Sequence, residues 1–204
     1  MSILVILAHP KPGSFNHAIA NAICERLQAG GKEVIFHDLH AEGFDPVYSA
    51  AELARDAVLP PAIERASQEV LAAEGIVVIH PNYWSTPPAI LKGWLDRALR
   101  PGLAYRFQTG PDGKGYVQSL IAAQAALVVT TANTSDEVDQ AVYGNPLENF
   151  WKTCVFGFFG ITRFKRCSFS PVIVSSPEQR ADWLEQARTA AQTLFLSPGE
   201  YGDK

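Results

Sequence analysis

Short apolar runs alternate along the chain with longer segments in which apolar residues recur every three or four positions. The runs are rich in Val, Ile and Leu, a composition that indicates strands covered on both faces of a parallel sheet. We predict strands at 2–8, 33–39, 75–80, 125–131 and 167–174. The longer segments have the spacing of amphipathic helices. We predict helices at 17–28, 61–71, 90–99, 147–158 and 177–195.

This alternation predicts an α/β fold with a doubly wound, five-stranded parallel sheet. Right-handed crossovers and the lengths of the connections favour the flavodoxin-like strand order 2-1-3-4-5. A six-stranded dinucleotide fold is disfavoured because no G-x-G-x-x-G motif follows the first strand. In the favoured order, the loops after strands one, three and four leave one edge of the sheet. We therefore expect 9–16, 82–86 and 130–134 to converge.

Three helix starts carry capping signals. Ser14 and Asn16 have side-chain oxygens that can accept hydrogen bonds from backbone N–H groups at a helix start. The segment 145–148, NPLE, has the pattern of a capping box, and Ser176 predicts a cap for the last helix. The first of these starts allows a second interpretation, since a helix N-terminus beside hydroxyl, amide and imidazole groups can bind a phosphate.

The chain of 204 residues is long enough for a full core, so we expect one domain over 1–196 and a polar tail at 197–204. Hydrophobic residues make up 47% and charged residues 19%, which argues against a disordered chain. No apolar run approaches the roughly 20 residues that span a bilayer, and the apolar start lacks the basic region of a signal peptide. We therefore expect a cytoplasmic protein that is not membrane-embedded.

The net charge and the spacing of the cysteines and histidines argue against a nucleic-acid-binding protein and against a metal site. The net charge is −4 and no basic block could follow a phosphate backbone, so no nucleic-acid partner is expected. Cys24, Cys154 and Cys167 are odd in number and widely spaced, which predicts neither a disulfide framework nor a zinc site, and we expect them in the core. The five histidines are scattered too, so we expect no metal site.

The segment 81–105, PNYWSTPPAILKGWLDRALRPGLAY, joins the third predicted strand to an amphipathic helix. Pro87 and Pro88 restrict φ and hold Thr86 extended, which predicts a rigid rim over 82–86. Because open α/β sheets bind ligands at the carboxyl ends of their strands, this rim is the first candidate for a binding site.

The most specific motifs are His-Pro at 9–10, Ser-Phe-Asn at 14–16, and the long run P-x-x-W-x-x-x-PAILKGWLDR at 81–97, with Ala-Tyr at 104–105. Together they resemble the flavodoxin-fold NAD(P)H:quinone oxidoreductases, which include DT-diaphorase and the bacterial potassium-efflux ancillary oxidoreductases. The resemblance runs over most of the chain. It implies a flavin cofactor, with flavin phosphate in the first loop and the isoalloxazine ring between the loops after strands three and four. The implied cofactor-binding residues are His9, Ser14, Phe15, Asn16, Pro81, Asn82, Tyr83, Trp84, Ser85, Thr130, Thr131, Ala132 and Asn133.

Two departures from the family pattern concern the loop after strand four. In diaphorases this loop has a sequence similar to Thr-Thr-Gly-Gly, whereas here Ala132 and Asn133 stand in place of the two glycines. The backbone of this loop is therefore expected to approach the flavin less closely than glycine permits. The family also carries a Tyr and a His that stabilise charge on the reduced flavin, but no histidine follows residue 80. Tyr143 lies near the position of that histidine. By the resemblance, Tyr143 and Trp84 are the candidate catalytic residues.

The activity implied by the resemblance is NAD(P)H dehydrogenase (quinone), an enzyme in which NADPH or NADH gives hydride to flavin N5 and a quinone then takes it. Either FMN or FAD, one per site, is compatible with the motifs. The resemblance and the apolar helix at 147–158 also predict a homodimer with the flavin near the subunit boundary. Two alternatives stay open: a flavin-binding ancillary subunit of a membrane transporter, and a one-electron carrier of the flavodoxin type.

Overall fold

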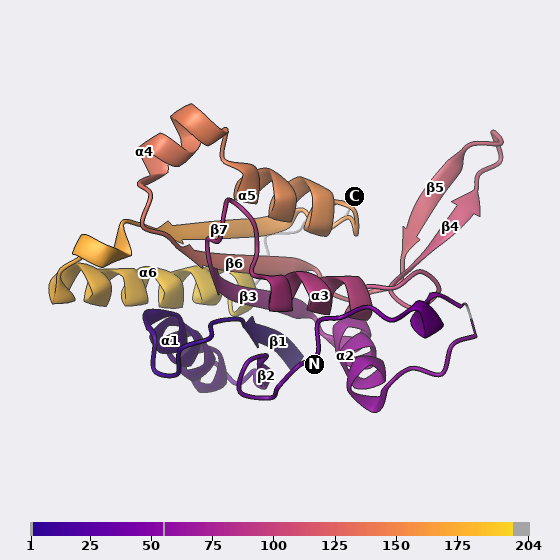
Figure 1. Cartoon of the computed structure of the whole chain (residues 1–204), viewed down its shortest axis with the longest axis horizontal. Helices are drawn as coiled ribbons and strands as arrows, with labels where there is room; N and C mark the ends of the chain where they lie inside the picture. Colours follow the sequence, from indigo (N-terminus) through magenta and orange to yellow (C-terminus); the bar gives the residue numbers. More distant parts are fainter. Residues whose placement is uncertain (1, 55, 198–204) are drawn as a thin grey trace.

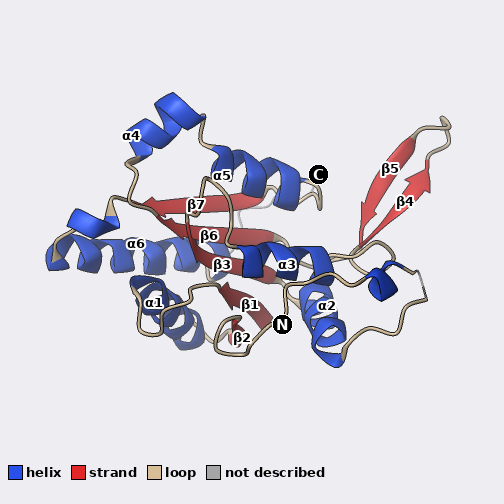
Figure 2. Cartoon of the chain, viewed as in Figure 1, coloured by secondary structure: helices blue, strands red, loops and turns tan. Residues whose placement is uncertain are grey.

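A computed structural model describes residues 2–54 and 56–197, so all of the predicted polar tail except Ser197 lies outside the described residues. Five parallel strands form one sheet in the order β2-β1-β3-β6-β7 (Figures 1 and 2). Since β6 and β7 are the fourth and fifth strands of this sheet along the chain, the predicted order 2-1-3-4-5 is confirmed. The strands are β1 (Ser2–Leu7), β2 (Glu33–Asp38), β3 (Gly75–Pro81), β6 (Ala125–Thr131) and β7 (Arg163–Phe169).

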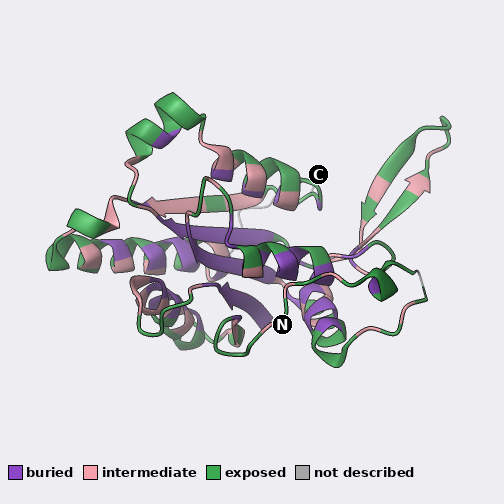
Figure 3. Cartoon of the chain, in the orientation of Figure 1, coloured by how far each residue is buried: buried purple, intermediate pink, exposed green. Residues whose placement is uncertain are grey.

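Helices cover both faces of the sheet. On one face, α1 (Phe15–Ala29) and α6 (Pro177–Phe195) pack on alternate residues of the central strands. On the other face lie α2 (Pro61–Ala72), α3 (Ala89–Ala98) and a helical segment made of α5 (Pro146–Glu148) and η3 (Asn149–Gly157). Strands β1, β3 and β6 are buried at every position, as Figure 3 shows, because both faces are covered. None of the helices formed by the described residues combines the length and apolarity needed to cross a membrane.

A two-stranded antiparallel hairpin projects from one end of the molecule, and the strands of the main sheet point away from it (Figure 1). It consists of β4 (Tyr105–Thr109) and β5 (Gly115–Ser119). The sequence pattern predicts only the turn at 110–115. The two strands escaped prediction because they are short, mix aromatic with polar residues and are exposed or half-buried throughout, so no apolar run marks them.

The predicted helix at 147–158 is present, but its turns are wider than those of an α-helix. Residues 149–157 form a π-helix, and the buried positions are Leu147, Trp151 and Phe156, four and five residues apart. An α-helical stripe through Cys154 and Phe158 was the wrong prediction, since both residues are exposed. The prediction of three core cysteines is also wrong, because Cys24 and Cys167 are only half-buried.

Two further predictions need correction. The fifth strand covers 163–169 rather than 167–174, because the chain leaves the sheet before Pro171, which has no N–H to donate, and forms a short 3-10 helix, η4 (Val172–Val174). The capping box at 145–148 does not form: Asn145 has a left-handed φ of 50° and makes no side-chain cap. Ser176 does cap α6 as predicted, since its hydroxyl oxygen accepts from the Gln179 N–H.

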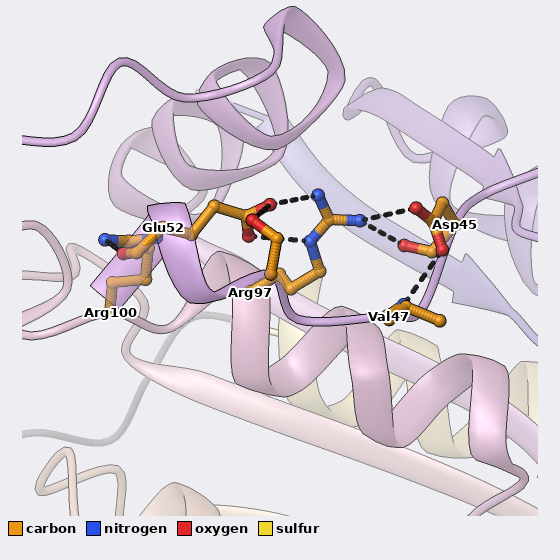
Figure 4. A network of polar contacts seen from close by, with 6 residues as sticks. Asp45, Val47, Glu52, Arg97 and Arg100 are labelled. Atoms are coloured by element: carbon orange, nitrogen blue, oxygen red, sulfur yellow. Dashed lines mark hydrogen bonds and ion pairs between the residues drawn. The ribbon is translucent and has the colours of Figure 1, made fainter. Parts of the chain in front are cut away.

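A buried ion pair fastens α3 to the long connection between β2 and α2 (Figure 4). Arg97 donates from Nε and Nη2 to the two carboxylate oxygens of Glu52 at 3.0 and 2.7 Å, and both side chains are 5% exposed. Glu52 lies in a short 3-10 helix, η1 (Ala50–Leu53), and its backbone carbonyl accepts from Arg100. Gly93 permits the close contact of α3 with this connection, because a Cβ there would lie 2.3 Å from the Pro46 carbonyl oxygen.

We predict that Arg97→Met lowers the free energy of unfolding by about 3–5 kcal/mol, because it leaves the Glu52 carboxylate buried without its partner. The double variant Arg97→Met, Glu52→Leu should recover part of this loss, since it removes the unpaired carboxylate, while Arg100 stays buried beside position 52. Urea unfolding measures both. Lys92→Met is the matched control: it breaks the exposed Lys92–Asp96 pair of the same helix and should cost below about 1 kcal/mol. Equal losses in the two single variants would contradict the prediction.

Candidate functional site

The three loops that were expected to converge are joined by hydrogen bonds at the carboxyl edge of the sheet. The Asn82 N–H donates to the carbonyl oxygen of Thr131 at 2.7 Å, which links the loops after β3 and β6. The side-chain amide of Asn16 donates to the hydroxyl of the same Thr131 at 2.9 Å, which links the start of α1 to them. Residues 9–16, 82–86 and 130–134 therefore form one continuous surface.

The first loop presents backbone donors at the N-terminus of α1. Ser14 is the N-cap residue, and its carbonyl accepts from His17 and Ala18, but its hydroxyl does not cap the helix. The N–H groups of Phe15 and Asn16, the first two helical residues, have no acceptor within the helix. With no acidic residue in the first turn, these donors and the helix dipole suit an anion.

The Ser14 hydroxyl instead contacts Nδ1 of His17 at 2.7 Å, and Nε2 of His17 contacts Oδ2 of Asp38 at 3.0 Å. The sequence pattern does not single out His17 or Asp38. Their partnership joins α1 to the end of β2, and residues 21 positions apart give no local signal.

Asn16 carries a buried polar atom without a partner. The residue is 3% exposed, and its Oδ1 accepts no hydrogen bond within the described part of the chain. An amide turned by 180° would accept from the Thr131 hydroxyl and present its two N–H donors instead. In that orientation the buried amide N–H groups are free to donate to acceptor oxygens of a ligand, and leaving them unpaired is costly. The first loop therefore fits the flavin that its motif implies.

Phe15 is placed differently from the other residues of this loop. Its ring packs against Phe169 and Trp183, with centroids 6.5 and 5.9 Å away, and lies under the guanidinium of Arg180. Its available contact to a phosphate is therefore the backbone N–H. His9 lies at the start of the loop, where its Nδ1 accepts from the Lys11 N–H at 3.1 Å.

The loop after β3 forms a tight turn with Trp84 at its tip. Tyr83 and Thr86 exchange two backbone hydrogen bonds of 3.1 Å, and the central residues Trp84 and Ser85 have φ of 55° and 59°. Positive φ at both central positions is the signature of a type I′ turn, which ordinarily uses Asn and Gly. The Ser85 N–H also donates to the Asn82 side chain at 2.8 Å. The predicted rigid rim is thus present, and it holds Trp84 98% exposed.

The loop after β6 has less free donor capacity than its motif suggests. The Ala132 N–H donates to the Phe169 carbonyl at 3.1 Å, and the Asn133 side chain accepts from the Ile173 N–H at 3.1 Å. Thr130 and Thr131 are buried, with their hydroxyls bound to Arg166 and Asn16. This loop therefore offers a fixed wall rather than a row of open N–H donors.

Tyr143 ends a short helical segment, α4 (Asp136–Val138) with η2 (Asp139–Tyr143), and is 55% exposed. Among the described residues, no hydrogen bond or ring contact joins Tyr143 to the three loops. The connection runs through Arg166 on β7, which donates to the Asn145 side chain at 2.7 Å and to the Thr130 hydroxyl at 3.2 Å. Arg166, which sequence reasoning missed, thereby fastens the chain just after Tyr143 to the carboxyl end of β6.

His80 lies near the end of β3, just before the Trp84 turn, and the sequence pattern did not single it out either. Its Nδ1–H donates to the Pro81 carbonyl at 2.8 Å, and its Nε2 accepts from the indole N–H of Trp151 at 2.9 Å. A carbonyl only accepts and an indole only donates, so the two partners fix one neutral tautomer. Complete burial lowers the pKa of His80 to about 4.

We predict that His80 makes the fold sensitive to acid. The unfolded chain protonates His80 near its ordinary pKa of 6.5, whereas the folded chain keeps it neutral down to about 4. Its contribution to stability is therefore complete above pH 6.5 and is lost as the pH falls toward 4, by roughly 3 kcal/mol.

The test is the free energy of unfolding of the wild type and of His80→Gln between pH 7.5 and 4.5. Gln keeps one donor and one acceptor but does not titrate, so the variant should lose less stability over this range. Parallel curves for the two proteins would show that His80 does not titrate as its burial requires.

Comparisons with known proteins agree with this architecture. A family described by its flavodoxin-like fold matches residues 1–195. An uncharacterized NAD(P)H oxidoreductase of Haemophilus influenzae is 31% identical over 200 residues, which cover 97% of each chain. NAD(P)H dehydrogenase (quinone) 1 of Rattus norvegicus is 30% identical over 220 residues, covering 94% of this chain and 77% of the rat protein. The solved structure of an NAD(P)H:quinone oxidoreductase from Methanothermobacter marburgensis has a TM-score of 0.81 and 23% identity, covering 95% of this chain and 96% of that one. The chain therefore belongs to the flavodoxin-fold family of NAD(P)H:quinone oxidoreductases.

Proposed function

We propose that this protein binds one flavin, FMN or FAD, at the carboxyl edge of its sheet and transfers hydride from NADPH or NADH to a quinone. The observation that carries the proposal is the convergence of three loops around Trp84, which a strained turn holds almost fully exposed. Strained backbone clusters at functional sites because the surrounding structure must offset its cost. An exposed indole on a rigid turn is suited to contact a flat aromatic ligand.

Each loop has a separate part in holding the flavin. The backbone N–H groups of Phe15 and Asn16, with His9 and the Ser14 hydroxyl, bind the phosphate end. The turn from Pro81 to Ser85 would hold the isoalloxazine ring through Asn82, Tyr83 and Trp84. Residues 130–133 would form the other wall of the ring site.

A bound flavin would supply the redox chemistry, the transfer of hydride from the nicotinamide to the quinone. The protein's contribution would be orientation and electrostatics. Trp84 would orient the stacked reactants, and the phenolic O–H of Tyr143 would stabilise negative charge at the site. Arg166 holds the Tyr143 segment in place through Asn145, and its charge is paired with Glu148, whose carboxylate lies 3.8 Å away.

The purified protein should therefore be yellow, or become yellow with added FMN or FAD, and oxidise NADPH or NADH with a quinone as acceptor. Heating followed by chromatography identifies the released flavin. A protein that binds neither flavin would refute the proposal.

A matched pair of serines tests the phosphate loop. Ser176 caps α6, so Ser176→Ala should lower the free energy of unfolding by about 1 kcal/mol and leave flavin affinity unchanged. The Ser14 hydroxyl does not cap α1, so Ser14→Ala should have a smaller effect on unfolding but weaken flavin binding by about 1–3 kcal/mol. The opposite pattern would mean that Ser14 serves only the fold.

We further propose that the protein is a cytoplasmic homodimer. The three cysteines are free thiols, as expected in a reducing compartment. The apolar helix at 147–158 was the first indication of a dimer. Its Trp151 and Phe156 are buried in the core, so only the exposed end of this helix is available for a subunit interface. There the Phe158 ring meets that of Tyr105 at 5.0 Å, and Tyr105 meets Phe107 at 5.5 Å, which makes one aromatic surface with the hairpin.

The hairpin exposes aromatic side chains that a subunit interface would bury. A two-stranded ribbon is marginally stable in water, and this one leaves Phe107 and Tyr116 72% and 54% exposed. A hollow of about 900 Å³, lined by residues that include Tyr48, Arg100 and Phe107, lies beside it at the amino edge of the sheet. A second copy of the chain would bury this surface, with about 1,600 Å² removed from water in total. This surface lies at the opposite edge of the sheet from the three loops, so such a dimer would not place the flavin at the subunit boundary that the resemblance predicts.

Phe107→Glu should therefore shift the protein from dimer to monomer in sedimentation experiments, because a charge in a buried apolar patch is costly. Phe36→Glu, at an exposed aromatic position on the edge strand β2, serves as the control and should stay dimeric. A wild-type protein that is active and monomeric at micromolar concentration would refute the dimer.

A further inference from the structure

Ser14, His17 and Asp38 form a continuous chain of hydrogen bonds that leads away from the N-terminus of α1. The Ser14 hydroxyl lies 2.7 Å from Nδ1 of His17, and Nε2 of His17 lies 3.0 Å from Oδ2 of Asp38. The side chains of His17 and Asp38 are 19% and 15% exposed. Residues from α1 and β2 thus place an imidazole between a hydroxyl and a carboxylate.

Asp38, at one end of this series of hydrogen bonds, has defined partners for both carboxylate oxygens. The backbone N–H groups of His40 and Ala41 both donate to Oδ1 of Asp38 at 3.1 Å, which leaves Oδ2 for the imidazole. A carboxylate only accepts hydrogen bonds, so Nε2 of His17 carries the proton. The remaining variable is the protonation of Nδ1.

Protonation of Nδ1 decides what Ser14 can offer to a ligand. In the neutral imidazole, Nδ1 is an acceptor, so the Ser14 hydroxyl donates to it and turns only lone pairs outward. In the charged imidazole, Nδ1–H donates to the Ser14 oxygen and frees the hydroxyl proton for another acceptor. A phosphate dianion has only acceptor oxygens, so it favours the second state, in which Ser14 donates to the phosphate and both nitrogens of His17 keep their partners.

We propose that binding of the flavin phosphate at the N-terminus of α1 is coupled to the uptake of one proton by His17, and that Asp38 stabilises the resulting imidazolium. The inference rests on the proposed function, because it assumes that this loop holds a flavin phosphate. It assigns His17 and Asp38 to phosphate recognition, although they reach the ligand only through Ser14. Riboflavin, which lacks the phosphate, should bind without this proton.

The charges around His17 support coupling to the ligand. His17 lies in the first turn of α1, where the helix dipole opposes a positive imidazole until an anion is bound. From β2, Asp38 favours the positive form, while His40 follows in the next connection. His9 faces His17 with the ring centroids 6.2 Å apart, and burial lowers the pKa of His9. Lys11 is the remaining cation of the first loop.

The coupling is measured by calorimetric titration of the flavin-free protein with FMN at pH 7.5 in PIPES, HEPES and Tris. These buffers have different ionisation enthalpies, so the dependence of the observed heat on the buffer gives the number of protons bound. We expect about one proton per FMN and none for riboflavin. By linkage, the Kd for FMN should rise with pH by at most about tenfold per unit, while that for riboflavin stays flat.

Variants identify the group that takes the proton. His17→Gln should abolish proton uptake with FMN and leave riboflavin affinity unchanged, and Asp38→Asn should reduce the uptake. His37→Gln is the matched control. Like His17, His37 contacts a carboxylate, in its case those of Glu42 and Glu69, but it faces α2 on the other side of the sheet. His37→Gln should retain the wild-type uptake.

Three results would overturn the inference: FMN binding without proton uptake, uptake that persists in His17→Gln, or uptake that disappears in His9→Gln but not in His17→Gln. The second result would place the proton on the phosphate, and the third would place it on His9. A wild-type protein that binds neither riboflavin, FMN nor FAD would refute the proposed function itself, an outcome distinct from flavin binding without a proton.

Discussion

Complete burial of three neighbouring parallel strands is the constraint on which the other features depend. β1, β3 and β6 have no exposed position, so their backbone groups must pair with one another and their loops must leave at the ends of the sheet. At the carboxyl end the pairing continues past the strands, where the Asn82 N–H meets the Thr131 carbonyl. The backbone hydrogen bonds between the strands therefore fix where the loops begin and how far apart they lie, independently of the side chains of the site.

The same constraint explains which parts of the fold were predictable. Strands covered on both faces must be apolar at every position, so the sequence marks β1, β3 and β6 clearly. The hairpin has no such mark, because its strands pair only with each other and carry exposed polar residues. The π-helix was mistaken for an α-helix because Leu147 and Trp151 fit both periods, and Phe156 reveals the wider turn only when its burial is known.

For the candidate site, residues in continuous motifs were predictable and residues that act in pairs were not. The motif places Trp84 and Asn16 at the right edge, but the partners His17 and Asp38, His80 and Trp151, and Arg166 and Asn145 are 21 to 71 positions apart. Each partnership depends on how β2, η3 or β7 is placed beside its neighbour. Such pairs arise from the fold, so a single sequence without structural coordinates carries no local sign of them.

The left-handed conformation of Trp84 and Ser85 has a consequence for the evolution and engineering of this protein. Each such residue costs of order 1–3 kcal/mol, so glycine at position 85 would relieve strain and make the free chain more stable. The same glycine would loosen the turn and let the indole of Trp84 take more orientations. If Trp84 contacts the flavin as proposed, each binding event would then carry the cost of ordering the indole, and selection for thermostability would oppose selection for turnover.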